Sequence, residues 1–189
     1  MPLYFAPPII WFAEAIQFKE VILVNDFKFP KQTLRNRLNY GSFQGLKSFT
    51  IPLNGDTKSN KFSEVLIDYK TDWSKQFIKT FQTTYGNSPF YEYYGYKFES
   101  IINSNIEYLW ELCLAFLNLI FKCLKIELLI TTQEFSTKEL VSTEKALTLY
   151  QNTPYYQVFN TSQPFIPNLS ILDLIFNEGP DAIQLIKNI

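Results

Sequence analysis

Residues 3–26 have the sequence LYFAPPIIWFAEAIQFKEVILVND, and this stretch decides the fold class. An apolar run at residues 3–6 stops at two prolines, and residues 9–19 are typical of a helix. Residues 21–24 form a second apolar run, typical of a strand that is buried on both faces. Strand, helix and strand in such quick succession predict a parallel βαβ opening. We therefore expect an α/β fold with a mixed, mainly parallel sheet.

Turn and capping signals divide the rest of the chain. The hydrophobic runs at residues 33–40 and 46–53 flank a glycine-containing turn, which predicts a β-hairpin. Apolar residues four apart after Asp72 predict the first helix of a large helical layer that covers residues 71–125. Beyond this layer we expect a strand at 127–130, a helix from 136, a proline-containing loop at 150–169, and two helices that meet at Gly179-Pro180. The alternative is an α+β fold in which the hairpin forms a small sheet of its own.

The composition is that of one globular domain covering residues 1–189. The chain is 47% hydrophobic and has a net charge of −1, which argues against a nucleic-acid binder and against a polybasic membrane-surface protein. Its most apolar segment has only ten residues between Glu111 and Lys122, too few to cross a membrane. The N-terminus carries no basic segment of the kind found in signal peptides, so we expect a cytoplasmic protein.

The chain contains no histidine, and this narrows the chemistry available to it. Ser-His and Cys-His nucleophile pairs are excluded, as is the commonest metal ligand. The two cysteines, Cys113 and Cys123, lie on one predicted helix about 15 Å apart, which is too far for a disulfide. We expect both to be reduced core residues. No nucleotide-binding or zinc motif is present, so we predict no cofactor and no metal site.

Arg35 and Arg37 are the only arginines among the 17 basic residues, and they lie two positions apart. Arginine is preferred over lysine where a planar anion is held by two parallel hydrogen bonds. An extended backbone at residues 33–40 would place both guanidinium groups on one face. Residues 27–55 contain no acid, and Lys28 and Lys31 precede the pair. The sequence thus predicts an anion-binding site, with a pair of exposed strand charges as the alternative.

Asp26 follows the predicted buried strand directly. Ligands bind at the carboxyl ends of strands in open parallel sheets, so this carboxylate is a candidate base or a group that orients a hydroxyl. The alternatives are a cap for the next turn and a structural salt-bridge network with the cations that follow.

Several segments resemble the WbqC-like family, in particular its shorter branch from Bacteroidetes-type bacteria. These are YFAPPIIWF at 4–12, KQTLRNR at 31–37, and above all FIPNLSILDLIFNEGP at 165–180. The resemblance spans essentially the whole chain. It implies a role among surface-polysaccharide genes of the O-antigen type, in building or modifying an activated sugar. The resemblance also implies an acid or a histidine at position 26, where this chain has Asp26. It implies a histidine at position 77 as well, where this chain has Phe77 instead.

Two interpretations follow. The first is a transferase that acts on a nucleotide-linked or amino sugar, with Asp26 and Lys31 in catalytic roles and Arg35, Arg37 and Lys28 binding the anion. The second is a non-catalytic binding or assembly protein of the same pathway, or a degenerate enzyme. Further candidate site residues are Asn36, Asp173 and Glu178. The sequence leaves the oligomeric state open.

Overall fold

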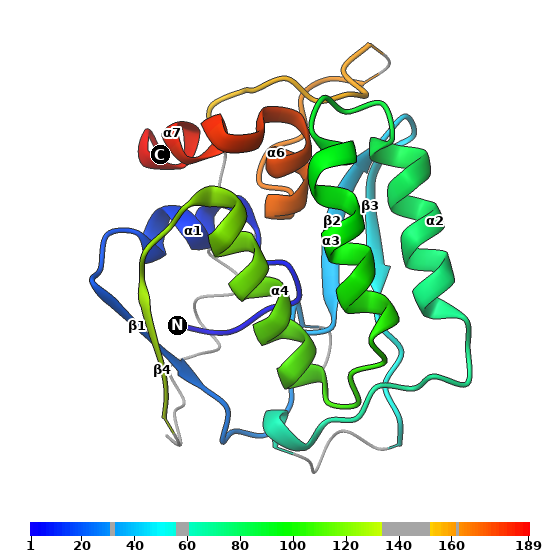
Figure 1. Cartoon of the computed structure of the whole chain (residues 1–189), viewed down its shortest axis with the longest axis vertical. Helices are drawn as coiled ribbons and strands as arrows, with labels where there is room; N and C mark the ends of the chain where they lie inside the picture. The colour runs from blue at the N-terminus through cyan, green and yellow to red at the C-terminus, as the bar shows by residue number, and fades with distance from the viewer. Residues whose placement is uncertain (31–32, 56–60, 134–151, 162) are drawn as a thin grey trace.

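A long apolar helix, α4 (Leu109–Leu124), lies at the centre of the fold (Figure 1). The computed structural model describes residues 1–30, 33–55, 61–133, 152–161 and 163–189. Ten of the sixteen residues of α4 are buried, because its apolar side chains surround the helix almost completely. Glu111 in the first turn and Lys122 in the last are its charged positions, and each complements the partial charge at its end of the helix.

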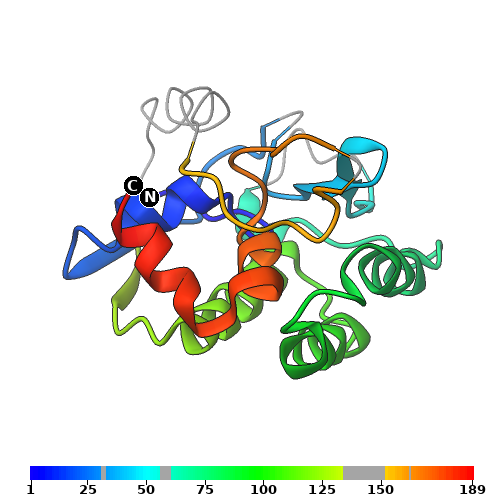
Figure 2. The same cartoon turned by 90° about the horizontal axis from the view of Figure 1, so that it is seen from above.

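The predicted helical layer is confirmed. Helices α2 (Trp73–Tyr85), α3 (Tyr91–Asn103) and α4 stand in a row, in that order, in both views (Figures 1 and 2). The four-residue spacing after Asp72 forms the buried stripe of α2, in which Phe77 and Phe81 stack with centroids 4.3 Å apart. The layer therefore follows from the apolar periodicity of the sequence.

The start of the last helix in this row differs from the prediction. A capping-box pattern at residue 104 predicts a helix from there, whereas α4 begins at Leu109. Residues 107–109 instead lie beside residues 65–67: Tyr108 bridges Leu66, and the Leu109 amide donates to the Val65 carbonyl at 2.9 Å. Hydrogen bonds to a distant segment thus replace the first helical turn.

Two parallel strands form the first sheet. β1 (Glu20–Val24) pairs with β4 (Leu129–Gln133), and Glu20 lies opposite Leu129 in the register. The strand at 21–24 is confirmed, and the expected 127–130 strand lies two residues further on. The prediction that this strand is buried on both faces was wrong, since Ile22 is 37% exposed. A sheet of two strands in this part of the chain leaves one face of β1 in water.

The prediction of a strand as the first element of the βαβ opening was also wrong. Helix α1 (Ile9–Ala15) follows two prolines as expected, but residues 3–6 form no strand. They run through the core instead, where the Phe5 amide donates to Leu34 O at 3.2 Å and the Phe5 ring lies 4.8 Å from that of Phe116. An apolar run of four residues does not distinguish a strand from an extended core segment.

The predicted hairpin is present and forms a sheet of its own, as in the alternative arrangement. β2 (Arg37–Ser42) and β3 (Gly45–Thr50) are antiparallel, with Ser42 opposite Gly45. Gly45 has a φ of +92°, which favours glycine, and the Ser42 hydroxyl closes the turn by donating to Gly45 O at 2.9 Å. Together with the helices and the parallel pair, the hairpin gives a mixed α/β fold, which confirms the predicted class.

The C-terminal part packs across the top of α4. Residues 152–161 and 163–169 contain no helix or strand, as predicted, and α6 (Ile171–Glu178) begins after Ser170, whose side chain accepts from the Leu172 amide. Gly179, with a φ of +55°, ends α6, and a short 3-10 helix (Gly179–Asp181) leads into α7 (Ala182–Lys187). The helix predicted from residue 136 lies outside the described residues.

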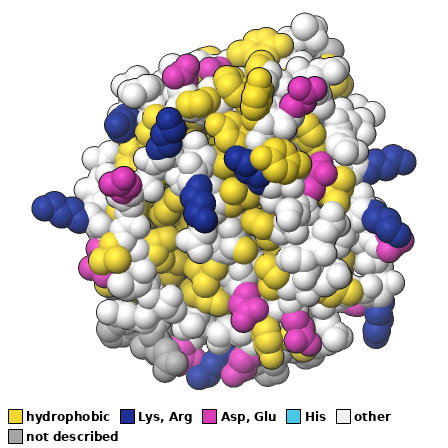
Figure 3. All heavy atoms as spheres, in the orientation of Figure 1, with side chains coloured by type: hydrophobic (Ala, Val, Ile, Leu, Met, Phe, Trp, Pro, Cys, Tyr) yellow, Lys and Arg dark blue, Asp and Glu magenta, His cyan; other side chains and the backbone are white. Residues whose placement is uncertain are grey.

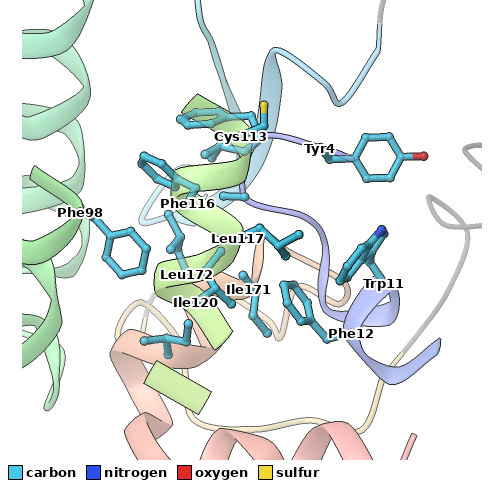
Figure 4. Close-up of a cluster of buried hydrophobic side chains, with 14 of the residues drawn as sticks. Tyr4, Trp11, Phe12, Phe98, Cys113, Phe116, Leu117, Ile120, Ile171 and Leu172 are labelled. Carbon is cyan, nitrogen blue, oxygen red and sulfur yellow. The ribbon is translucent and has the colours of Figure 1, made fainter. Parts of the chain in front are cut away.

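Buried apolar side chains of the helices, of β1 and β2 and of the connecting segments form one hydrophobic cluster. Figure 4 shows Phe116, Leu117 and Ile120 of α4 between Phe98 of α3 on one side and the aromatic side chains of α1 on the other. Cys113 and Cys123 are both buried and free, as predicted. Burial raises the pKa of the Cys123 thiol to about 11, so the thiol stays protonated near neutral pH. A buried, protonated thiol is not a reactive nucleophile.

Candidate functional site

Asp26 lies just beyond the carboxyl end of β1, in an ion pair with Lys61. The Lys61 ammonium is 2.6 Å from Asp26 Oδ1, and 30% of the Asp26 side chain remains exposed. Lys61 precedes the 3-10 helix η1 (Phe62–Glu64). The expected placement of an accessible carboxylate at the end of the strand therefore holds. Its partner Lys61 was missed, because no local pattern in the sequence connects positions so far apart.

Backbone hydrogen bonds hold the two segments together. Lys28 and Lys61 form an isolated antiparallel bridge, and the Phe62 amide donates to Phe27 O at 3.0 Å. The pairing places Asp26, Lys28 and Lys61 in one small region, which we call the β1-end cluster. The Lys28 side chain is exposed and the Asp26 side chain is 30% exposed, so both charges are accessible from solvent.

Arg35 is placed differently from the prediction: it is inside the protein. Its residue is 2% exposed, and its guanidinium carbon lies 4.8 Å from the centre of the Phe27 ring. The rings of Tyr4 and Phe62 lie at 5.4 and 5.9 Å, and Nη1 donates to Thr33 Oγ1 at 2.7 Å. Such contacts between a cation and aromatic faces stabilise the buried charge. Arg35 therefore fixes the position of Phe27, directly after Asp26.

Arg37 does not share a face with Arg35. The strand begins at Arg37, and residues 34 and 35 lie in a turn, so the extended backbone on which the shared face depended is absent. The Thr33 hydroxyl also accepts from the Arg35 amide at 3.2 Å, which favours a turn over a strand. Arg37 instead donates from Nε to Thr50 Oγ1 at 3.1 Å, across the hairpin.

A small cavity beside Arg37 has room for about one water molecule, with a volume of about 10 Å³. Arg37, Asn39 and Asn168 line it together with apolar side chains. The Asn36 side chain contributes to the fold. Its Nδ2 donates to Ile51 O at 3.0 Å and continues the pairing of the hairpin. Lys31, the second predicted catalytic residue, lies outside the described residues.

Asp173 is buried in the first turn of α6, where its Oδ2 accepts two side-chain hydrogen bonds. The Tyr155 hydroxyl donates to Oδ2, and Gln157 Nε2 donates to the same oxygen at 3.2 Å. Asp173 is 0% exposed, and this burial raises its pKa to about 6, although the hydrogen bonds oppose the shift. A group so enclosed cannot contact a ligand in solution, and Asp173 is a structural residue.

Other polar side chains around Asp173 fasten the proline-containing loop to α6. The amide of Gln157 donates to Ile166 O at 2.9 Å and accepts from Ile166 N at 3.0 Å, so that it bridges the loop internally. Glu178, the remaining predicted candidate, accepts from the Tyr156 amide at 3.2 Å. Tyr155 and Gln157 were missed, since a loop without periodicity gives no sign of which side chains turn inward.

The face shown in Figure 3 has no dominant charge. On the face shown in Figure 3, cationic and acidic side chains are scattered among exposed hydrophobic ones. Within the described residues, no three acidic or sulfur side chains come together in a way that would hold a metal ion. The helices of that same part of the chain are all too short or too polar to cross a membrane.

Comparison with known proteins gives one family. The model of the WbqC-like protein family matches residues 3–153 and 144–185, which together cover nearly the whole chain. The match includes the β1-end cluster, both arginines and the loop that is fastened to α6. Searches of curated proteins and of solved structures returned no match. The chain belongs to the WbqC-like protein family.

Proposed function

We propose that this protein acts in the biosynthesis of a surface polysaccharide of the O-antigen type, and that it binds an anionic activated sugar at the β1-end cluster. The observation that carries the proposal is the Asp26–Lys61 ion pair at the carboxyl end of a parallel strand, beside the exposed Lys28. Carboxyl ends of parallel strands are where α/β proteins bind ligands. Membership in the family is consistent with this setting.

In this proposal, Lys28 and Lys61 hold the phosphate groups of a nucleotide-linked sugar. Asp26 is the base or the group that orients a sugar hydroxyl, and Lys31 assists. Arg37 binds the anion from the start of β2, and Arg35 acts through the aromatic rings that it holds, not by contact. The reaction supported best is a transfer to or from the sugar or its amino group, in the cytoplasm.

A non-catalytic binding or assembly role in the same pathway is the second candidate. The burial of Arg35 favours it, because one of the two expected guanidinium groups faces aromatic rings and not solvent. The absence of histidine also favours it, since the usual proton-transfer group near neutral pH is missing.

Thermal unfolding with a panel of nucleotide-linked sugars tests binding. A ligand at 100 times its dissociation constant raises the free energy of unfolding by about 2.7 kcal/mol. We expect a shift for at least one ligand, and its loss in Lys28→Ala and Lys61→Ala. Lys75→Ala is the matched control, because that lysine is exposed on α2 and pairs with Asp72 at 3.2 Å.

Turnover then separates the two candidates. The wild-type chain and Asp26→Asn are incubated with each ligand that binds, and products are followed by chromatography. Product formed by the wild type and lost in Asp26→Asn supports the transferase. Binding without any product supports the binding protein, and binding of no ligand, or equal binding by Lys28→Ala and Lys61→Ala, overturns the proposal.

A further inference from the structure

A groove of about 510 Å³ lies between the β-hairpin and α2, away from the β1-end cluster. Its volume is within the range of small-molecule sites, which is about 300–1,000 Å³. None of its lining residues was a candidate on the sequence. We call it the hairpin groove, and the residues that give it its chemistry are Tyr40, Lys47, Phe49, Gln76, Lys79 and Thr80.

Regular secondary structure builds both walls of the groove. Tyr40 is directly opposite Lys47 in the hairpin register, so their side chains leave the same face of the sheet. Phe49 lies two residues beyond Lys47 on β3 and therefore shares that face. On α2, Gln76 and Thr80 are four residues apart and line one side of the helix. Sites on strands and helices are held more rigidly than sites on loops.

Two aromatic rings anchored in the core form the floor. The Tyr40 ring lies 5.7 Å from that of Phe81, and the Phe49 ring lies 5.1 Å from that of Phe77 at an interplanar angle of 88°. Both Tyr40 and Phe49 remain half-buried, so each ring has a packed side and a side open to the groove. An anchored, half-exposed aromatic ring is the usual platform for the C–H face of a sugar or for another flat group.

The charge of the groove is entirely positive. Lys47 is on the hairpin wall and Lys79 on the helix wall, both exposed, and the lining contains no acid. Neither lysine forms an ion pair within the described part of the chain. Partial burial raises the pKa of Tyr40, so its hydroxyl stays protonated and adds no negative charge. The two ammonium groups are therefore available to an anion between the walls.

Hydroxyl and amide groups complete the lining. Thr80 and Thr83 lie one turn apart on α2, and Gln76 and Gln44 add amides on opposite walls. The Thr83 hydroxyl donates to Lys79 O at 2.8 Å and offers its lone pairs to a ligand, and the other groups both donate and accept, as a ligand with several hydroxyls requires. Two lysines on a chain of net charge −1 do not make a nucleic-acid surface, which would need a broad basic patch.

We infer that the hairpin groove binds a sugar phosphate, with the phosphate between Lys47 and Lys79 and the ring of the sugar on Tyr40 and Phe49. The threonine and glutamine side chains bind the sugar hydroxyls. The site shares no residue with the β1-end cluster, so this inference goes beyond the proposed function and stands independently of it.

Isothermal titration of the full chain with hexose 1-phosphates and hexose 6-phosphates tests the inference. Inorganic phosphate, unphosphorylated hexoses and free nucleotides are titrated in parallel. We expect a hexose phosphate to bind at least tenfold more tightly than inorganic phosphate, because the ring contacts add to the charge contacts. The Lys47→Ala/Lys79→Ala double variant should weaken this binding at least tenfold, and a rise in salt concentration should weaken binding to the wild type.

Matched variants separate this site from other sources of binding. Lys75→Ala removes an exposed lysine of the same helix outside the groove, and Asp26→Asn and Lys28→Ala alter the β1-end cluster. Lys75→Ala should bind the hexose phosphate as the wild type does, and the other two variants show how much of the binding belongs to the β1-end cluster. Both groove lysines are exposed, so the double variant should keep the wild-type circular dichroism spectrum.

Three results would overturn the inference. They are the absence of hexose phosphate binding at millimolar concentration, equal binding by the double variant, and binding of inorganic phosphate or nucleotide as tight as that of the sugar phosphate. Loss of binding in Asp26→Asn or Lys28→Ala with retention in the double variant would assign the ligand to the β1-end cluster instead.

Discussion

The Tyr155 hydroxyl donates a hydrogen bond to the Asp173 carboxylate in the interior of the protein, and so connects the proline-containing loop to α6. The carboxylate is fully enclosed, and its pKa is raised to about 6. This pair makes the stability of the fold depend on pH in a defined direction.

Asp173→Asn should remove that pH dependence. Between about pH 4 and 6 the folded protein keeps a proton on Asp173 that the unfolded chain has released, so the free energy of unfolding falls as pH rises. From pH 4 to 7 the wild type should lose about 2 kcal/mol relative to the variant. Urea unfolding of both proteins at pH 4 and pH 7 measures this difference. A difference that is the same at both pH values would contradict the prediction.

Tyr155→Phe should destabilise the protein mainly at neutral pH. The variant leaves a buried carboxylate with one donor fewer, which costs about 1–3 kcal/mol. At pH 4 Asp173 is protonated, and the loss should be smaller. Urea unfolding at the two pH values checks this, with Tyr156→Phe as the control, because the neighbouring tyrosine is 54% exposed. Equal losses in the two variants would show that the hydrogen bond contributes nothing.

Gly41→Ala should destabilise the protein by about 1–3 kcal/mol through overpacking. A Cβ atom at position 41 would lie 1.8 Å from Cζ of Phe159, whose ring is fully buried. The double variant Gly41→Ala/Phe159→Leu should show less than the sum of the two single losses. Thermal unfolding of the four proteins gives the coupling energy, and additive losses would rule out the contact.

Arg35→Lys should cost about 1–3 kcal/mol, whereas Arg37→Lys should change stability by less than about 0.5 kcal/mol. The planar guanidinium of Arg35 faces three aromatic rings and donates to Thr33, and an ammonium group cannot reproduce this arrangement. Arg37 is only half-buried and bonds an exposed threonine. Chemical unfolding of both variants compares the two, and similar losses would contradict the different roles.

The sequence predicted those elements in which one periodic pattern extends over several turns or ends at a strong turn signal. The stripe of α2, the hairpin and the helix after Ser170 are of this kind. It did not predict the start of α4, because the capping signal at residue 104 competes with pairing to residues 65–67. Distant contacts of this kind decide whether a local capping signal starts a helix, and a single sequence does not show them.

The candidate site shows the same limit. The position of Asp26 followed from the strand before it, and the structure places it there with an exposed edge. The alternation of Arg35 and Arg37 suited a strand, but the Arg35 amide donates to the Thr33 hydroxyl in a turn, and the Arg35 side chain is buried. Lys61, Tyr155 and Gln157 meet their partners only through tertiary packing, and no spacing in the chain connects them.

The pairing of β1 with β4 has a consequence for synthesis on the ribosome. The register joins Glu20 to Leu129, a separation of 129 − 20 = 109 residues. At about 5–20 residues per second, β1 waits roughly 5–20 s for its partner strand to be made. During this time the backbone edge of β1 has no strand to pair with. The nascent chain is therefore most exposed to aggregation and most dependent on chaperones before residue 133 emerges.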